Sequence, residues 1–159
     1  MRKCVSTADR ENEMPLSDSL PGTWQLLSRV DLSRSGDPVE EPSLGSDPLA
    51  LLVYDRAGHF AAQFMKRDRS ASRSDEALAA GPNNTRARGG YDAYFGTYTV
   101  DDASGSVTQT LLGALSPENV GQTVTRAMTV VGNTLTISLE TKSLDGQEVV
   151  RTLVWTRVA

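Results

Sequence analysis

An arginine on the apolar face of a predicted strand is the residue with the clearest capacity for chemistry. Arg126 alternates with Val124 and Met128, whereas threonines occupy the opposite face. If the apolar face points inward, the guanidinium is buried and needs a carboxylate, a carbonyl or an aromatic ring as partner. Arg126 is therefore a candidate anchor for a ligand carboxylate or enolate oxygen. The alternative is a structural residue that stacks on Trp24 or pairs with Glu140.

The only histidine is the natural candidate for general acid–base catalysis, because its usual pKa lies near neutrality. His59 directly follows the hairpin glycine Gly58, a position that is also typical of a solvated strand start. Two arrangements stay open. His59 and Gln63 line the interior together, or both face water while the alternate residues of their strand pack inward.

Tyrosines on otherwise apolar strands can orient a ligand through their phenol groups, or can simply fill the core. The residues expected to line a binding site are Tyr54, Phe64, Met65, Tyr94, Tyr98, Arg126 and Met128. For an enzyme, the catalytic candidates are His59, Tyr98 and Arg126. Arg151 alternates with Leu153 and Trp155, but its place near a strand start favours exposure.

Composition argues against several classes of protein. The net charge of −4 disfavours nucleic-acid binding, which needs clustered Lys and Arg. Cys4 and His59 are the only thiol and imidazole, so no metal site of the usual ligand types is expected. Neither phosphate-binding nor dinucleotide-binding motifs occur, which predicts no cofactor. Apolar runs such as 49–53 are too short to span a membrane.

The first nineteen residues are polar and contain no apolar segment of a secretory signal. We expect them to form a flexible tail, followed by one domain over residues 20–159. These features predict a cytoplasmic protein, either a monomer or a weak homodimer.

Short β-type segments separated by turn residues predict an all-β fold. In the first strand, Trp24 and Val30 are expected on the core face and Arg29 on the opposite face. The predicted strands are Thr23–Val30, Leu49–Tyr54, His59–Met65, Tyr94–Val100, Ser106–Leu112, Thr123–Val131, Thr134–Glu140 and Glu148–Arg157. About eight strands in up-and-down order predict an antiparallel barrel wide enough for one small ligand.

One long connection interrupts this pattern between Lys66 and Asp92. Such a connection in a compact domain is usually a lid, a binding loop or a disordered stretch. Within it, Ser74–Gly81 has a capping serine, acids in the first turn and a terminal glycine, so a short helix is predicted there.

The ordered motifs of the chain resemble the lipocalin-like domain family of bacteria and fungi. They are Gly22-Thr23-Trp24, Leu52-Val53-Tyr54 with Gly58-His59-Phe60, the stretch Tyr94-Phe95-Gly96-Thr97-Tyr98, and Gly113-Ala114-Leu115-Ser116-Pro117 with Gly121 and Arg126. The resemblance covers residues 22–157 and implies a lipocalin-like barrel with an internal cup. Other members often carry histidine and glutamate around Gln109-Thr110-Leu111-Leu112, so an acid–base role there is not expected in this chain.

Three functions fit these observations. The first is binding of a small, mostly apolar molecule inside the barrel. The second is a cofactor-free isomerase or cyclase of secondary metabolism, which would hold a polyketide- or terpene-like substrate while Arg126 and a tyrosine or His59 polarise a carbonyl. The third is a protein-interaction domain whose barrel is filled by its own side chains.

Overall fold

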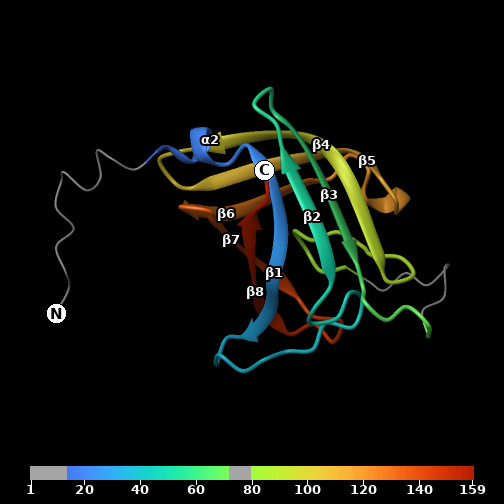
Figure 1. The fold of residues 1–159 in the computed structure, drawn as a ribbon. Helices are drawn as coiled ribbons and strands as arrows, with labels where there is room; N and C mark the ends of the chain where they lie inside the picture. The colour runs from blue at the N-terminus through green and yellow to red at the C-terminus, as the bar shows by residue number, and fades with distance from the viewer. Residues whose placement is uncertain (1–13, 72–79) are drawn as a thin grey trace, which may run out of the picture.

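Eight antiparallel strands form a closed barrel in which each strand pairs with the next and β8 pairs with β1. The computed structural model describes residues 14–71 and 80–159 (Figure 1). The strands are β1 (Gly22–Ser33), β2 (Leu49–Tyr54), β3 (His59–Met65), β4 (Tyr91–Asp101), β5 (Ser106–Ala114), β6 (Thr123–Val131), β7 (Thr134–Lys142) and β8 (Glu148–Arg157). The predicted all-β, up-and-down barrel is confirmed.

Four predicted strands have the observed bounds, and the other four are longer than predicted. The largest differences are at the end of β1, which continues to Ser33, and at the start of β4, which begins at Tyr91. The described residues also include the four-residue helix α2 (Leu16–Ser19) and the 3-10 turn η1 (Pro117–Asn119). The helix predicted over Ser74–Gly81 lies almost entirely outside the described residues.

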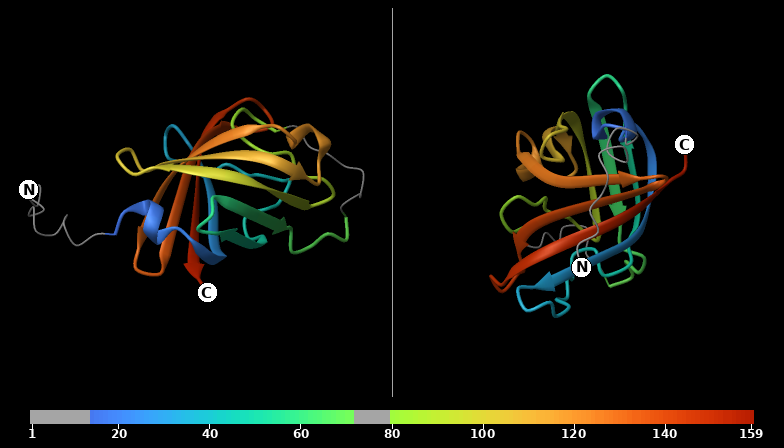
Figure 2. Two further views of the ribbon diagram at one scale, coloured as in Figure 1. Left: turned by 90° about the horizontal axis from the view of Figure 1, so that it is seen from above. Right: turned by 90° about the vertical axis from the view of Figure 1, so that its left-hand side faces the viewer.

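The helix α2 lies at one end of the barrel (Figure 2). The side chain of Trp24 fills the interior at this end, here called the closed end. The Trp24 ring is fully buried, and its Nε1 donates to the carbonyl of Leu20 at 3.0 Å. The guanidinium of Arg157 lies 4.3 Å from the Trp24 ring centroid and donates to the carbonyls of Ser19 and Pro21. The arginine that stacks on Trp24 is thus Arg157 rather than Arg126, because it comes from β8, the strand beside β1.

An irregularity in β1 reverses which side chains point inward. Trp24 faces the core as predicted, but the register with β8 shifts between Leu26 and Ser28. One extra residue in a strand moves every later side chain to the other face. Arg29 is consequently buried and Val30 is 44% exposed, so the predicted orientation of both residues was wrong.

The opposite end of the barrel, here called the open end, is bordered by the connections β1–β2, β3–β4, β5–β6 and β7–β8 (Figure 1). No helix in the described part of the chain is long and apolar enough to cross a membrane. Within residues 14–71 and 80–159, no three His, Cys, Asp or Glu side chains gather in a way that could hold a metal ion.

A second irregularity, between Phe95 and Gly96 in β4, requires a glycine. A Cβ at Gly96 would lie 1.8 Å from the carbonyl oxygen of Thr110, whereas one at Gly113 would meet the exposed Phe95 ring. We expect Gly96→Ala to lower the free energy of unfolding by about 3 kcal/mol, since backbone cannot move aside. Gly113→Ala should cost about 1 kcal/mol, since the ring can rotate. Urea denaturation of the two variants checks this, and equal losses would contradict it.

Candidate functional site

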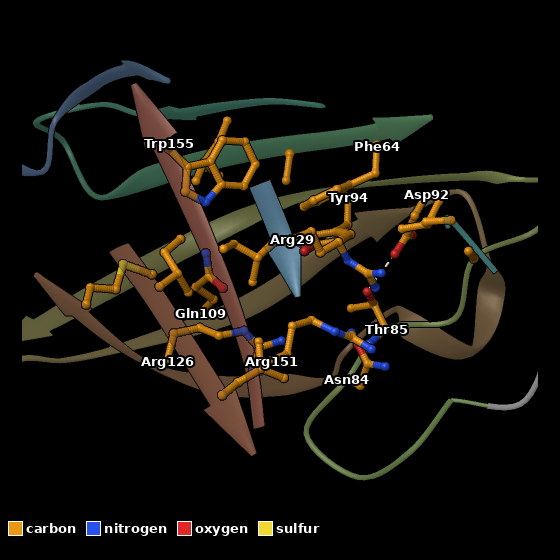
Figure 3. A pocket seen from close by; sticks show the side chains of 18 of the residues that line it. Arg29, Phe64, Asn84, Thr85, Asp92, Tyr94, Gln109, Arg126, Arg151 and Trp155 are labelled. Carbon is orange, nitrogen blue, oxygen red and sulfur yellow. Dashed lines mark hydrogen bonds between the residues drawn. The ribbon is translucent and has the colours of Figure 1, made fainter. Parts of the chain in front are cut away.

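A cavity of about 50 Å³ lies in the barrel half next to the open end, and its wall is part apolar and part polar. The apolar lining includes Leu52, Phe64, Ile137, Leu139, Leu153 and Trp155. The polar lining includes Arg29, Asn84, Thr85, Asp92, Tyr94, Gln109, Arg126 and Arg151 (Figure 3). Such a wall can hold an apolar body and fix the orientation of a polar group attached to it.

Two of the three arginines in this wall are neutralised by carboxylates of the chain. Arg151 of β8 donates to both carboxylate oxygens of Asp31 on β1, at 2.7 and 3.0 Å, and both side chains are almost fully buried. Arg29 donates to Glu41 of the β1–β2 connection at 2.8 Å. Burial alone would raise the pKa of Glu41, but Arg29 and a hydrogen bond from Ser43 hold it below its usual value.

The third arginine has only neutral partners among the described residues. Arg126 is 6% exposed, and its Nη1 donates to the carbonyls of Asn83 at 2.8 Å and Thr125 at 3.1 Å. No carboxylate of residues 14–71 and 80–159 lies within ion-pair distance of it. The alternative in which Arg126 pairs with Glu140 is wrong, since Glu140 is exposed on β7.

Two tyrosines and a glutamine supply neutral polar groups to the same cavity. Gln109 donates to the Tyr54 hydroxyl at 2.7 Å, and that hydroxyl lies 3.9 Å from the sulfur of Met128. Burial raises the pKa of Tyr54 well above its usual value and that of Tyr94 to about 12. Both phenols therefore stay protonated near neutral pH and can donate hydrogen bonds.

Asp92 is a carboxyl group of the wall that has no arginine partner within the described residues. It is 3% exposed, its Oδ2 accepts from Thr85 at 2.6 Å, and its Oδ1 has no partner within the described residues. Burial raises the pKa of Asp92 to about 7, because hydrogen bonds from Thr85 and the Ala93 amide offset only part of the lost hydration. Asp92 is thus about half protonated at neutral pH.

Residues 81–88, here called the crossing segment, cover part of the open end. The Asn83 amide makes two hydrogen bonds with the backbone of Thr125 in β6, at 2.9 and 3.0 Å. Asn119 in η1 makes two with the backbone of Arg86, at 2.9 and 3.2 Å. Paired amide contacts of this kind hold the segment against the barrel as a ladder of strand hydrogen bonds would.

The comparison with protein families agrees with this architecture. The sequence pattern of the lipocalin-like domain family matches residues 21–158, a range that contains all eight strands of the barrel. The chain belongs to this family. No curated protein matches the chain at a significant level of similarity.

The lipocalin-like domain brings together five of the seven residues expected to line its site. Tyr54, Phe64, Tyr94, Arg126 and Met128 all border the cavity. Met65 and Tyr98 do not border it. The inward orientation of Arg126 next to Val124 and Met128, which the alternation predicted, is confirmed.

The remaining three candidates lie away from the cavity of the lipocalin-like domain. Met65 borders a shallow groove on the outer face of β2 and β3. Tyr98 packs against Tyr54, and its hydroxyl donates to the carbonyl of Asp55 in the β2–β3 turn at the closed end. His59 lies in the same region, with 61% of its side chain exposed and Nδ1 3.4 Å from Asp55. Of its two predicted arrangements, the solvated one is observed.

Several polar residues of the wall were missed or misplaced by the sequence reasoning. Arg151 was expected to be exposed and is buried, although its alternation with Leu153 and Trp155 was a usable signal. The irregularity in β1 turns Arg29 to the inner face, and regular strand alternation does not predict this orientation. Asn84 and Thr85 come from an irregular connection whose position no periodicity reveals.

The buried pair Arg151–Asp31 offers a test of how the lipocalin-like domain tolerates its interior charges. We expect Asp31→Asn to lower the free energy of unfolding by about 3–5 kcal/mol, because it leaves a buried guanidinium uncompensated. Glu148→Gln is the matched control, since it breaks the exposed pair with Arg34 and should cost less than about 1 kcal/mol. Chemical denaturation measures both losses, and equal losses would show that the buried pair contributes no more to stability than the exposed pair does.

The raised pKa of Asp92 predicts a pH dependence of stability. The folded state keeps the Asp92 proton up to about pH 7, whereas the unfolded state releases it near the usual carboxyl pKa of 3.8. This group therefore favours the folded state most at low pH, and that contribution declines between about pH 4 and 7 by up to about 1.4 kcal/mol per pH unit. Asp92→Asn removes the decline, so its stability relative to the parent should rise across this window. Urea denaturation from pH 4 to 8 measures the difference, and a flat difference would mean that Asp92 is ionised in the folded protein.

Proposed function

We propose that this lipocalin-like domain binds one small organic molecule inside the open half of its barrel. The observation that carries the proposal is the internal cavity, which is bordered by aromatic and aliphatic side chains and by buried hydrogen-bond donors. The closed half, by contrast, is filled by Trp24 and its neighbours. Ligand sites of small barrels have this combination of a filled floor and a lined mouth.

The size of the cavity limits the ligand. Its volume of about 50 Å³ is well below the roughly 300–1,000 Å³ of sites for drug-sized molecules. The proposed ligand thus has few non-hydrogen atoms in this conformation, with a mostly apolar body against Phe64 and Trp155. A larger ligand would require the crossing segment to move, because Asn84 and Thr85 form part of the wall.

The enzymatic alternative, a cofactor-free isomerase or cyclase, has one observation in its favour. Asp92 borders the cavity with a pKa of about 7, which suits a group that gives and takes a proton near neutrality. His59 and Tyr98 do not support this role, since they lie at the other end of the barrel. Arg126 and Tyr94 are the groups left to polarise a substrate carbonyl.

A pair of alanines on β3 tests the binding proposal. Ala62 faces the cavity and Ala61 is on the outer face. We expect Ala62→Leu to fill part of the cavity and abolish binding of small molecules, while Ala61→Leu leaves it unchanged. Ligand-observed NMR with a library of very small fragments measures binding, and native mass spectrometry detects any molecule retained from the producing cells.

Thermal unfolding of both alanine variants serves as the control, because added methyl groups in a core can also destabilise it by about 1–3 kcal/mol. The comparison is made at a temperature where all three proteins are folded. If no fragment binds to the parent, or if the same fragments bind equally to Ala62→Leu, the binding proposal is wrong.

A further inference from the structure

The charges buried around the cavity do not cancel within the described residues. Arg29, Arg126 and Arg151 contribute three cations, while Glu41 and Asp31 contribute two anions. Guanidinium groups keep their charge at any physiological pH, even where burial lowers their pKa. One positive charge is therefore in excess when Asp92 carries its proton.

The excess resides on Arg126. Its only hydrogen bonds in the described part of the chain run from Nη1 to two backbone carbonyls, which carry no net charge. Its Nε and Nη2 groups donate no hydrogen bond to any described residue, and neither atom is fully buried. These two groups therefore keep some accessible surface, and Arg126 is one of the residues that line the cavity.

The neighbouring acid does not replace the missing anion. Asp92 is engaged by Thr85 and forms no ion pair within the described residues. Tyr54 and Tyr94 also interact electrostatically with Arg126, and burial raises the pKa of both phenols, so both are protonated. When Asp92 carries its proton, the described groups around the cavity thus offer hydrogen-bond donors to an incoming anion and no competing negative charge.

We propose that the ligand of this barrel is a monocarboxylate whose carboxylate group binds to Nε and Nη2 of Arg126. A guanidinium presents two parallel N–H donors that match the two oxygens of a carboxylate, and the pairing is strong where water is excluded. The short apolar chain of the acid then lies against Phe64, Leu52 and Trp155. A monoanion balances the single excess charge, whereas a phosphate dianion would leave one negative charge buried. This inference rests on the proposed function and adds the chemical class of the ligand.

The test compares butyrate with butyramide, two molecules of the same shape that differ in charge. We expect the unaltered protein to bind butyrate about tenfold more tightly, because hydrogen bonds between charged groups are stronger than those between neutral groups. The readouts are the affinity from NMR titration and the shift of the Arg126 Nε–H resonance, which only butyrate should move strongly. Inorganic phosphate is titrated in parallel and should bind more weakly than butyrate.

Two substitutions assign the effect to one arginine. Arg126→Gln should lower the affinity for butyrate at least about tenfold and leave that for butyramide nearly unchanged. Arg34→Gln is the matched control, because it removes the same charge from a side chain that is 85% exposed, and should change neither affinity. The comparison of butyrate with butyramide on the unaltered protein needs no variant, so it decides the matter even if Arg126→Gln folds poorly.

The outcomes separate the two proposals. If butyrate and butyramide bind equally and Ala62→Leu abolishes both, the cavity binds small molecules but the carboxylate assignment is wrong. Preference for phosphate over butyrate would likewise overturn the assignment to monocarboxylates. If neither molecule binds and the fragment library gives no binder, the proposed function itself fails.

Discussion

The burial of three guanidinium groups inside an eight-stranded barrel is the constraint on which the rest of the structure depends. Removing a charged group from water costs several kcal/mol, and interactions with partners in the interior have to offset that cost. For Arg151 the partner is Asp31, across the seam between β8 and β1. For Arg29 it is Glu41, which the long β1–β2 connection places over the open end. These two ion pairs therefore help to hold the seam and the β1–β2 connection in place, in addition to strand pairing.

The barrel has two halves that differ in what their side chains contribute. The closed half is stabilised by apolar burial around Trp24 and by the Arg157 guanidinium stacked on its ring. The open half has charged and hydroxyl groups around its cavity, so apolar burial stabilises it less than it stabilises the closed half. A site in which no carboxylate of residues 14–71 and 80–159 pairs with Arg126 is less stable than a fully paired one. An anionic ligand that pairs with Arg126 would recover this difference in free energy.

The fold could be predicted from the sequence because its signals are local. Alternation, turn residues and strand spacing were sufficient for the barrel, and Gly22-Thr23-Trp24 with the Tyr94–Tyr98 stretch was sufficient for the family. The site was predicted only in part, since five lining residues follow from strand alternation. The rest depends on events that alternation does not encode. The extra residue in β1 turns Arg29 inward, and residues 83–85 reach the cavity through hydrogen bonds to distant elements.

The pairing of β1 with β8 also has a consequence for how the chain reaches this structure. The Asp31–Arg151 contact joins residues 120 positions apart, so closing the barrel carries the large loop-closure entropy that makes such topologies slow to fold. Until β8 is in place, β1 and β7 present unpaired strand edges, which can pair with other chains. The same step that encloses the cavity therefore ends the period in which the folding chain is most prone to aggregate.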